Sequence, residues 1–193
     1  GVDGRSVYHS MNAVPEMIWV KRRNTTGQWV VGHKGLDGGN EPWTHYLTLE
    51  TTAQEDDYPL FYDTQPTSTY FRVGGHAEVN GNSNEFISML FSSVAGISKV
   101  GSYTGNGTTA TTTQEIPTGF SPRFIIIKRV SSTGGWLTFD TVRGLDKRLE
   151  LNEPAAQDVL DVIGSVSASS FTVKGNLDNS NNNGNKYVYY AHA

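Results

Sequence analysis

Asp140 and Arg143 are the two residues whose types and spacing come closest to a catalytic arrangement. They stand three residues apart, after an apolar run and directly before Gly144. An arginine can orient a carboxylate for catalysis or ligand binding, but the same two groups also match in bidentate geometry and fix turns. We favour the turn-fixing interpretation, because such a pair is common in structural repeats and a motif alone does not establish function.

Other carboxylates qualify for glycoside hydrolysis by type only. That chemistry needs two carboxyl groups roughly 5–9.5 Å apart across a sugar. The acidic segment from Gln54 to Tyr58 is typical of a solvated turn, and it lacks the ligand spacing of an EF-hand calcium loop. We therefore predict no catalytic residue, and a polysaccharide depolymerase is the least favoured function. The candidate carboxylates are Glu50, Glu55, Asp56, Asp57, Glu150 and Glu153.

Metal, nucleophile and phosphate motifs are missing from the sequence. The five histidines show neither His-x-x-x-His nor His-Glu-x-x-His spacing. There is no Gly-x-Ser-x-Gly elbow and no P-loop, and the Gly-rich stretches lie between expected strands without a following helix. We predict no metal and no cofactor.

Aromatic residues are the better candidates for binding. They concentrate in an insertion from Gly38 to Tyr70, which makes the first half of the chain longer than the second. Sugar rings stack on Trp and Tyr faces, and the same residues dominate protein–protein hot spots. The alternative is that they cover the end of a hydrophobic core. The predicted ligand-binding residues are Trp43, Tyr46, Tyr58, Tyr62 and Tyr70.

Composition narrows the class of protein. The chain has 193 residues, 36 % of them hydrophobic, with abundant Gly, Thr, Ser and Asn, a profile typical of many short strands joined by turns. A net charge of −4 gives no electrostatic reason to expect nucleic acid as a partner. Cysteine is absent, and no run of 18 apolar residues predicts membrane insertion. Because it begins with Gly1, we interpret the chain as processed or as a piece of a longer polypeptide.

The sequence repeats itself. PEMIWVKRRNTTGQW, from Pro15 to Trp29, matches PRFIIIKRVSSTGGW, from Pro122 to Trp136. Four further blocks recur in the same order over most of the chain, so we interpret the repeat as an internal duplication. The later matching pairs are GHKGLD with DTVRGLD, LTLETTA with LELNEPA, TYFRVGG with SSFTVKG, and NEFISMLF with NKYVYYAH.

Each block predicts a strand. The apolar runs 17–20 and 124–127 fit central strands, while 47–49, 71–73, 149–151 and 171–173 alternate apolar and polar residues. The segment 153–164 is the one expected helix. The predicted fold is an all-β antiparallel β-sandwich built from an internal duplication, lectin- or jelly-roll-like, with repeats 1–100 and 101–193 sharing one core. Trp29 and Trp136 are predicted to be paired structural core residues.

The second half resembles a repeat module of marine bacteriophage virion proteins, often described as tail-fibre or structural proteins. The first half follows the pattern more loosely, with His33-Lys34-Gly35 where the pattern has Asp-x-x-Arg-Gly. The resemblance implies a β-sandwich in a virion fibre, spike or capsid-surface appendage. The residues that carry it are Tyr103–Gly107, Gly119–Pro122, Lys128-Arg129, Trp136, Asp140–Gly144 and Leu149–Asn152.

We therefore expect a non-enzymatic virion structural module, made in the bacterial cytoplasm and carried on the extracellular particle. Its expected partners are other virion proteins and copies of itself, as a homo-oligomer, with a host-surface glycan as a further partner. The alternative is a glycan-binding, lectin-like adhesion domain, supported by the aromatic insertion.

Overall fold

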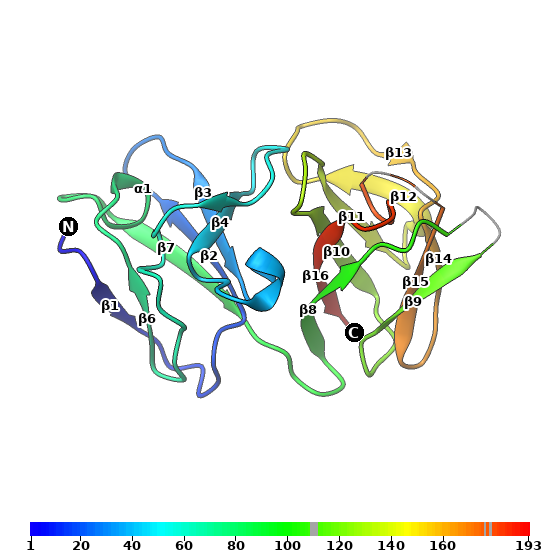
Figure 1. The fold of residues 1–193 in the computed structure, drawn as a ribbon, viewed down its shortest axis with the longest axis horizontal. Coiled ribbons are helices and arrows are strands. Elements are labelled where there is room, and N and C mark those ends of the chain that lie inside the picture. Colours follow the sequence, from blue (N-terminus) through cyan, green and yellow to red (C-terminus); the bar gives the residue numbers. More distant parts are fainter. Residues whose placement is uncertain (109–111, 176, 178) are drawn as a thin grey trace. The chain divides into compact units, whose positions relative to one another are not determined.

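The computed structural model describes residues 1–108, 112–175, 177 and 179–193, and it consists almost entirely of short strands (Figure 1). The predicted all-β antiparallel class is confirmed, because every strand pairing within the described part of the chain is antiparallel. The chain forms two compact units, the first from residues 1–50 and 55–92 and the second from residues 51–54 and 93–193. The main boundary thus follows Ser92, and the short segment Thr51–Gln54 belongs to the second unit.

The first unit contains a five-stranded sheet of order β5-β4-β3-β2-β7 and a two-stranded sheet of β1 and β6. Two short helical segments, the 3-10 turn η1 (Leu36–Gly39) and α1 (Ala77–Asn80), connect its strands. The strands are β1 (Arg5–Tyr8), β2 (Met17–Arg22), β3 (Trp29–His33), β4 (His45–Thr48), β5 (Asp56–Asp57), β6 (Tyr70–Val73) and β7 (Phe86–Phe91).

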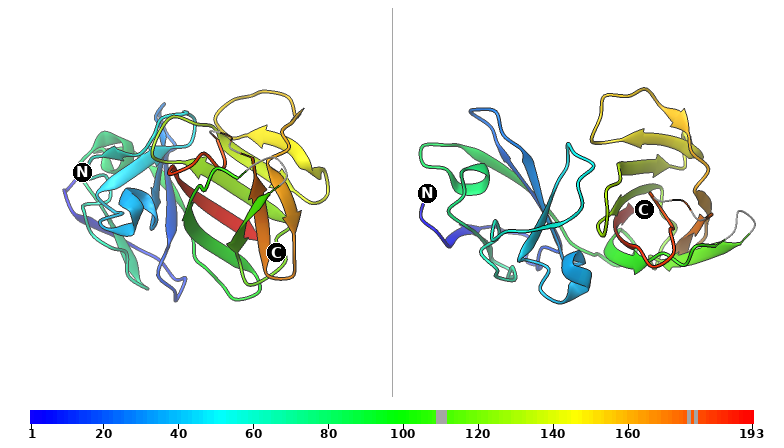
Figure 2. Two further views of the ribbon diagram at one scale, coloured as in Figure 1. Left: turned by 45° about the vertical axis from the view of Figure 1, so that its right-hand side comes forward. Right: turned by 45° about the horizontal axis from the view of Figure 1, so that its top comes forward.

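The second unit contains a six-stranded sheet of order β13-β12-β11-β10-β16-β8 and a three-stranded sheet of order β14-β15-β9. Figure 2 shows the same strands from two further directions. The strands are β8 (Ser98–Thr104), β9 (Thr113–Pro117), β10 (Phe124–Arg129), β11 (Trp136–Asp140), β12 (Gly144–Glu150), β13 (Asp158–Val159), β14 (Ile163–Val166), β15 (Ser170–Lys174) and β16 (Lys186–His192).

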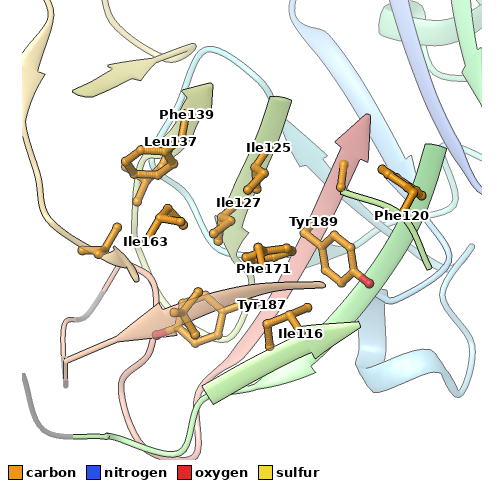
Figure 3. Packing of buried hydrophobic residues seen from close by; sticks show 13 residues of the cluster. Ile116, Phe120, Ile125, Ile127, Leu137, Phe139, Ile163, Phe171, Tyr187 and Tyr189 are labelled. Carbon is orange, nitrogen blue, oxygen red and sulfur yellow. The ribbon is translucent and has the colours of Figure 1, made fainter. Parts of the chain in front are cut away.

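Each unit has a hydrophobic cluster between its own two sheets. In the second unit, Ile125 and Ile127 of β10 face Phe171 of β15 across the core, with Tyr187 and Tyr189 of β16 beside them (Figure 3). In the first unit the cluster includes Ile18 and Val20 of β2 and Phe71 and Val73 of β6. In the strands of the two smaller sheets every second side chain points inward, so a strand of four residues contributes two side chains to the core. Each unit thus has a cluster of its own, and the core that we expected the two repeats to share stays a prediction.

The two units repeat one pattern of strand pairing. The order β5-β4-β3-β2-β7 corresponds to β13-β12-β11-β10-β16, and the pair β1-β6 corresponds to β9-β15. The residue-by-residue register also agrees with the sequence repeat. This agreement supports the duplication, which stays our interpretation of the two copies. The matching pairs are Met17–Phe91 with Phe124–His192, Lys21–Trp29 with Lys128–Trp136, Val31–Leu47 with Thr138–Leu149, and Val7–Phe71 with Ile116–Phe171.

The helix predicted over residues 153–164 is wrong. This segment contains β13 and the start of β14 instead. The side chain of Arg148 on β12 forms an ion pair with Asp158 in β13, and Val162 and Ile163 are buried in the core of the second unit. Tertiary pairing therefore overrides the local helical pattern. None of the helices in the described residues is long and apolar enough to cross a membrane.

Candidate interaction surface on the first unit

The outward face of the β1–β6 sheet carries three tyrosines and an arginine, which we call the tyrosine–arginine cluster: Tyr8, Tyr62, Tyr70 and Arg72. Alternation along β6 places Phe71 and Val73 in the core, so the other two residues of this strand point outward. The register between the strands sets Tyr8 opposite Tyr70. The strand period and register thus account for Tyr8, Tyr70 and Arg72.

The guanidinium of Arg72 lies over two aromatic rings. Its Cζ atom is 5.8 Å from the ring centroid of Tyr62 and 5.9 Å from that of Tyr70. Tyr8 packs edge-on against Tyr70, with the ring centroids 5.9 Å apart, and remains 78 % exposed. Cation–π contact with both rings restricts the guanidinium.

Arg72 has no carboxylate partner among the ion pairs of the described residues. Its Nε atom is buried without a hydrogen-bond partner in the described structure. A guanidinium without a carboxylate partner of its own is suited to bind a carboxylate or phosphate from outside through its terminal nitrogens, because those groups accept two parallel hydrogen bonds.

Local backbone conformation positions Tyr62 in this cluster. Tyr62 and Asp63 have positive φ angles of 55° and 45°, a conformation uncommon for residues other than glycine. The Tyr62 ring lies across Gly4, where an added Cβ would come within 2.7 Å of the ring Cζ atom. Any side chain at position 4 would therefore displace this tyrosine.

A second feature of the first unit is a polar hollow of about 580 Å³. Three successive residues beside it, Asp37, Gly38 and Gly39, have positive φ angles. The backbone N–H of Asp37 donates to the Glu55 carboxylate over 2.7 Å and fixes the loop. Amide, carboxylate and ammonium groups around one hollow are the groups that bind sugar hydroxyls. The lining residues are Lys34, Gly39, Asn40, Glu41, Pro42, Trp43, Thr44, Asp63 and Gln65.

The five predicted ligand-binding aromatics do not form one site. Trp43 is 5 % exposed and packs edge-on against Phe61 in the core cluster, so it offers no free face for stacking a sugar. The hydroxyl of Tyr46 donates to Asp56, and burial, together with this carboxylate, raises the pKa of Tyr46. Tyr58 packs edge-on against the ring of His76 at another hollow. Only Tyr62 and Tyr70 come together, around an arginine that the sequence analysis did not select.

Asp140 and Arg143 fix the turn between β11 and β12. The Asp140 Oδ1 atom accepts hydrogen bonds from the backbone N–H groups of Val142 (3.0 Å) and Arg143 (2.8 Å), and Oδ2 forms an ion pair with the Arg143 side chain. Partial burial opposes ionisation, but the hydrogen bonds from Arg143 outweigh it and lower the pKa of Asp140. Gly144, with φ of +112°, completes the turn. This arrangement is that of a structural pair.

Several candidate carboxylates have structural partners. The backbone N–H of Trp29 donates to Glu50 (3.0 Å), and Glu150 forms a 2.8 Å ion pair with Arg148. Within the described residues, no group of three or more His, Asp or Glu side chains is arranged to hold a metal ion.

Lys128 is a buried cation that the sequence analysis missed. Its side chain is fully buried, and its Nζ atom donates to the carbonyl oxygens of Thr52 (3.2 Å), Ala53 (2.7 Å) and Gly134 (2.7 Å). Burial, with a smaller contribution from the charge of Arg129, lowers the pKa of Lys128 from 10.5 to about 8. All three acceptors are backbone carbonyls, so the lysine links the segment Thr52–Ala53 to the hairpin of β10 and β11 within the second unit.

The two repeated tryptophans differ in burial. Trp136 is 2 % exposed, whereas Trp29 is only partly buried and packs edge-on against Trp19 with a centroid distance of 6.4 Å. The expectation of two equivalent core residues therefore applies to Trp136 and not to Trp29.

The sequence profile of one family, described as "Domain of unknown function (DUF7483)", matches residues 1–193. Comparisons with curated protein sequences and with solved structures give no significant match.

Proposed function

Because the chain belongs over its whole length to the DUF7483 family, whose function is unknown, we propose from its own residues that it is a non-enzymatic structural module of a bacteriophage virion. It forms part of a tail fibre, spike or capsid-surface appendage and binds other virion proteins or copies of itself. The support from sequence is the ordered set of motifs in the second repeat, from Tyr103–Gly107 to Leu149–Asn152, that resembles virion repeat modules.

The tyrosine–arginine cluster is the observation that carries a protein-binding function. Tyrosine and arginine are enriched in the few interface residues that supply most of the binding energy. The Arg72 side chain already contacts two rings, so it loses less conformational entropy than a free arginine when a partner binds. A partner that places a carboxylate against this guanidinium also pairs a positive charge that has no carboxylate partner among the ion pairs of the described residues.

The test is incorporation into particles. Purified chain is added to particles assembled without it, and the copies bound per particle are counted by quantitative mass spectrometry. Arg72→Ala and Tyr8→Ala are expected to lower the bound copies at least tenfold with unchanged melting temperature. Tyr58→Ala, which removes an exposed tyrosine outside the cluster, is the matched control and retains binding. Absence of the chain from purified particles of the phage that encodes it would refute the proposal.

A glycan-binding function is the second candidate, and the polar hollow is the observation that favours it. Its lining groups, among them Glu41 and Gln65, are of the kind that bind sugar hydroxyls. Trp43→Ala is a poor test because it would open the core, so the informative variants are Glu41→Ala and Gln65→Ala. Binding on a glycan array that both variants reduce would support this function, and an array without signal would count against it.

A further inference from the structure

The two units differ at one edge of their large sheets. In the second unit, β8 pairs antiparallel with β16 over seven residues, from Lys186–Thr104 to His192–Ser98. In the first unit, β7 is the counterpart of β16, and no described strand pairs with its far side. The sheet of the first unit therefore lacks the sixth strand that the same pattern of pairing accommodates in the second.

Hydrogen bonding in the second unit shows which residues of β16 face β8. The carbonyl oxygens of Lys186 and His192 accept from residues beside β10, whereas that of Asn185 accepts from Gly105, next to β8. Backbone groups alternate in direction along an antiparallel strand. Tyr187, Tyr189 and Ala191 therefore use their backbone groups to bind β8.

Backbone groups alternate between the two sides of β7 in the same way. The carbonyl oxygens of Glu85 and Phe91 accept from Arg23 (2.8 Å) and Glu16 (2.7 Å), next to β2. Since direction alternates, the N–H and C=O groups of every second residue between them, Phe86, Ser88 and Leu90, point to the free side. The edge thus presents three donors and three acceptors at the spacing that an antiparallel strand requires.

Beside this edge lies a cavity of about 230 Å³ between the two sheets of the first unit. Its walls combine apolar side chains with the polar groups of Arg5, Asn80 and Asn84, and Phe86 and Ser88 of β7 form one side. Such a cavity next to an open strand edge can receive one inward-pointing side chain of an added strand. The lining residues are Arg5, Val7, Val20, Phe71, Val73, Val79, Asn80, Asn84, Phe86, Ile87 and Ser88.

The second unit fills the corresponding place with a tyrosine. Tyr103 of β8 lies directly opposite Tyr187 and stacks on its ring, with the centroids 5.0 Å apart and the planes at 14°. Its hydroxyl donates to the carbonyl of Ser180. By register, Tyr187 corresponds to Phe86 of the first unit. An aromatic side chain opposite Phe86 would therefore occupy the cavity of the first unit, in the same way that Tyr103 packs against the core of the second unit.

The sequence of β7 lacks the usual protection of a free edge. The segment Phe86–Phe91 contains neither a charged residue nor a proline, and Ile87 and Met89 are 47 % and 40 % exposed. Natural proteins normally blunt an exposed edge with charges, prolines or bulges, because an open edge pairs with other chains. An edge that keeps its pairing capacity is typical of strand addition.

We propose that β7 and the adjoining cavity form an acceptor groove for an extended strand of a partner polypeptide. The strand lies antiparallel to β7 and places an aromatic side chain opposite Phe86, in the cavity. In the second unit, Gly101 is opposite Tyr189, where a Cβ would come within 2.5 Å of the tyrosine ring. Ser88 replaces that tyrosine in the first unit, so the partner strand need not carry glycine there. This inference goes beyond the proposed function, because it concerns a site separate from the tyrosine–arginine cluster.

The test uses the full chain and a fluorescent peptide with the sequence of residues 97–105, ISKVGSYTG, as the probe. Fluorescence anisotropy is expected to show saturable binding, and replacing the peptide's tyrosine by alanine should weaken it at least tenfold. Ser88→Pro should abolish binding, because proline removes a donor on the free side while leaving the pairing with β2 intact. Ser88→Ala keeps the backbone donor and is the matched control.

Hydrogen exchange tests the same point in the unaltered chain, so that the result does not depend on folding of the proline variant. Saturating peptide should slow exchange at the amides of Phe86, Ser88 and Leu90 at least tenfold and leave Ile87 and Met89 unchanged. No binding at millimolar peptide, or equal binding by the proline variant, would overturn the proposal. A dimer that forms with rising protein concentration and is absent in Ser88→Pro would show that a second copy of this chain occupies the groove. That result would overturn the proposal of a separate partner polypeptide. Arg72→Ala should bind the peptide normally, so failure here is distinguishable from failure of the proposed function.

Discussion

Replacement of Lys128 by methionine is the most informative perturbation of the second unit. Methionine has a similar length and no charge, so it removes the ammonium group without opening a large cavity. The carbonyl oxygens of Ala53 and Gly134 lose their 2.7 Å hydrogen bonds. At pH 7 we expect a net loss of stability of about 1–3 kcal/mol, because acceptors lose their donor while the cost of burying a charge disappears.

The pH dependence of the free energy of unfolding tests the role of Lys128 more sharply than a measurement at pH 7 alone. The pKa of Lys128 falls from 10.5 to about 8 on folding, so the unfolded chain holds this proton more tightly than the folded chain. Stability must therefore rise with pH between these two values. From pH 7 to pH 9.5 this single group adds about 2 kcal/mol to the free energy of unfolding. Methionine has no proton to exchange and removes this rise.

Urea denaturation at both pH values measures the effect. The difference between the gain of the unaltered chain and that of Lys128→Met cancels all other titrating groups and should be about 2 kcal/mol. Lys21→Met is the matched control, because Lys21 holds the same register position in the first unit but is only partly buried. Parallel stability curves for the unaltered chain and Lys128→Met would refute the reasoning.

Three further predictions concern packing and turns. Trp136→Ala should cost about 3–5 kcal/mol in chemical denaturation and the partly exposed Trp29→Ala about 1 kcal/mol, whereas equal losses would contradict the difference in burial. Asp140→Asn should change stability at pH 7 by less than about 1 kcal/mol, since the ion pair is partly exposed. Because folding lowers the pKa of the Asp140 carboxyl, the stability that this carboxylate contributes is lost as the pH falls below 3.8. The melting temperature of the variant should therefore decrease less steeply in this range than that of the unaltered chain, and an identical decrease would count against this. Gly101→Ala should cost about 1–3 kcal/mol, and a double-mutant cycle with Tyr189→Ala should show coupling, since the added Cβ meets that ring; additive losses would be inconsistent with the contact.

The strands were predictable because they depend on local alternation and on the sequence repeat. The apolar run 124–127 and the alternating segments 71–73 and 171–173 all form strands as expected. The helix expected over 153–164 failed because its residues are held by β12 and by the core of the second unit, which lie elsewhere in the sequence.

The candidate site was less predictable, since residue type does not reveal whether an aromatic ring packs in the core or faces solvent. Trp43 belongs to the core, and Tyr62 is exposed. Alternation in TYFRV would have placed Tyr70 and Arg72 on one outward face, and this signal was available in the sequence. No comparable signal reveals the acceptors of Lys128, because Thr52 and Ala53 lie 76 and 75 residues away along the chain.

The segment Thr51–Gln54 has a consequence for biosynthesis. It emerges from the ribosome well before the residues that bind it. The groups that donate to its carbonyl oxygens, the Lys128 ammonium and the Gly134 amide, are made later. The first unit is therefore synthesised before the carbonyl groups of Thr52 and Ala53 can meet these donors on β10 and in the loop that leads to β11. A gene truncated after Ser92 would leave this connection without those contacts. Conversely, a fragment from Ser93 onward would have to fold with the Lys128 ammonium deprived of two of its three acceptors.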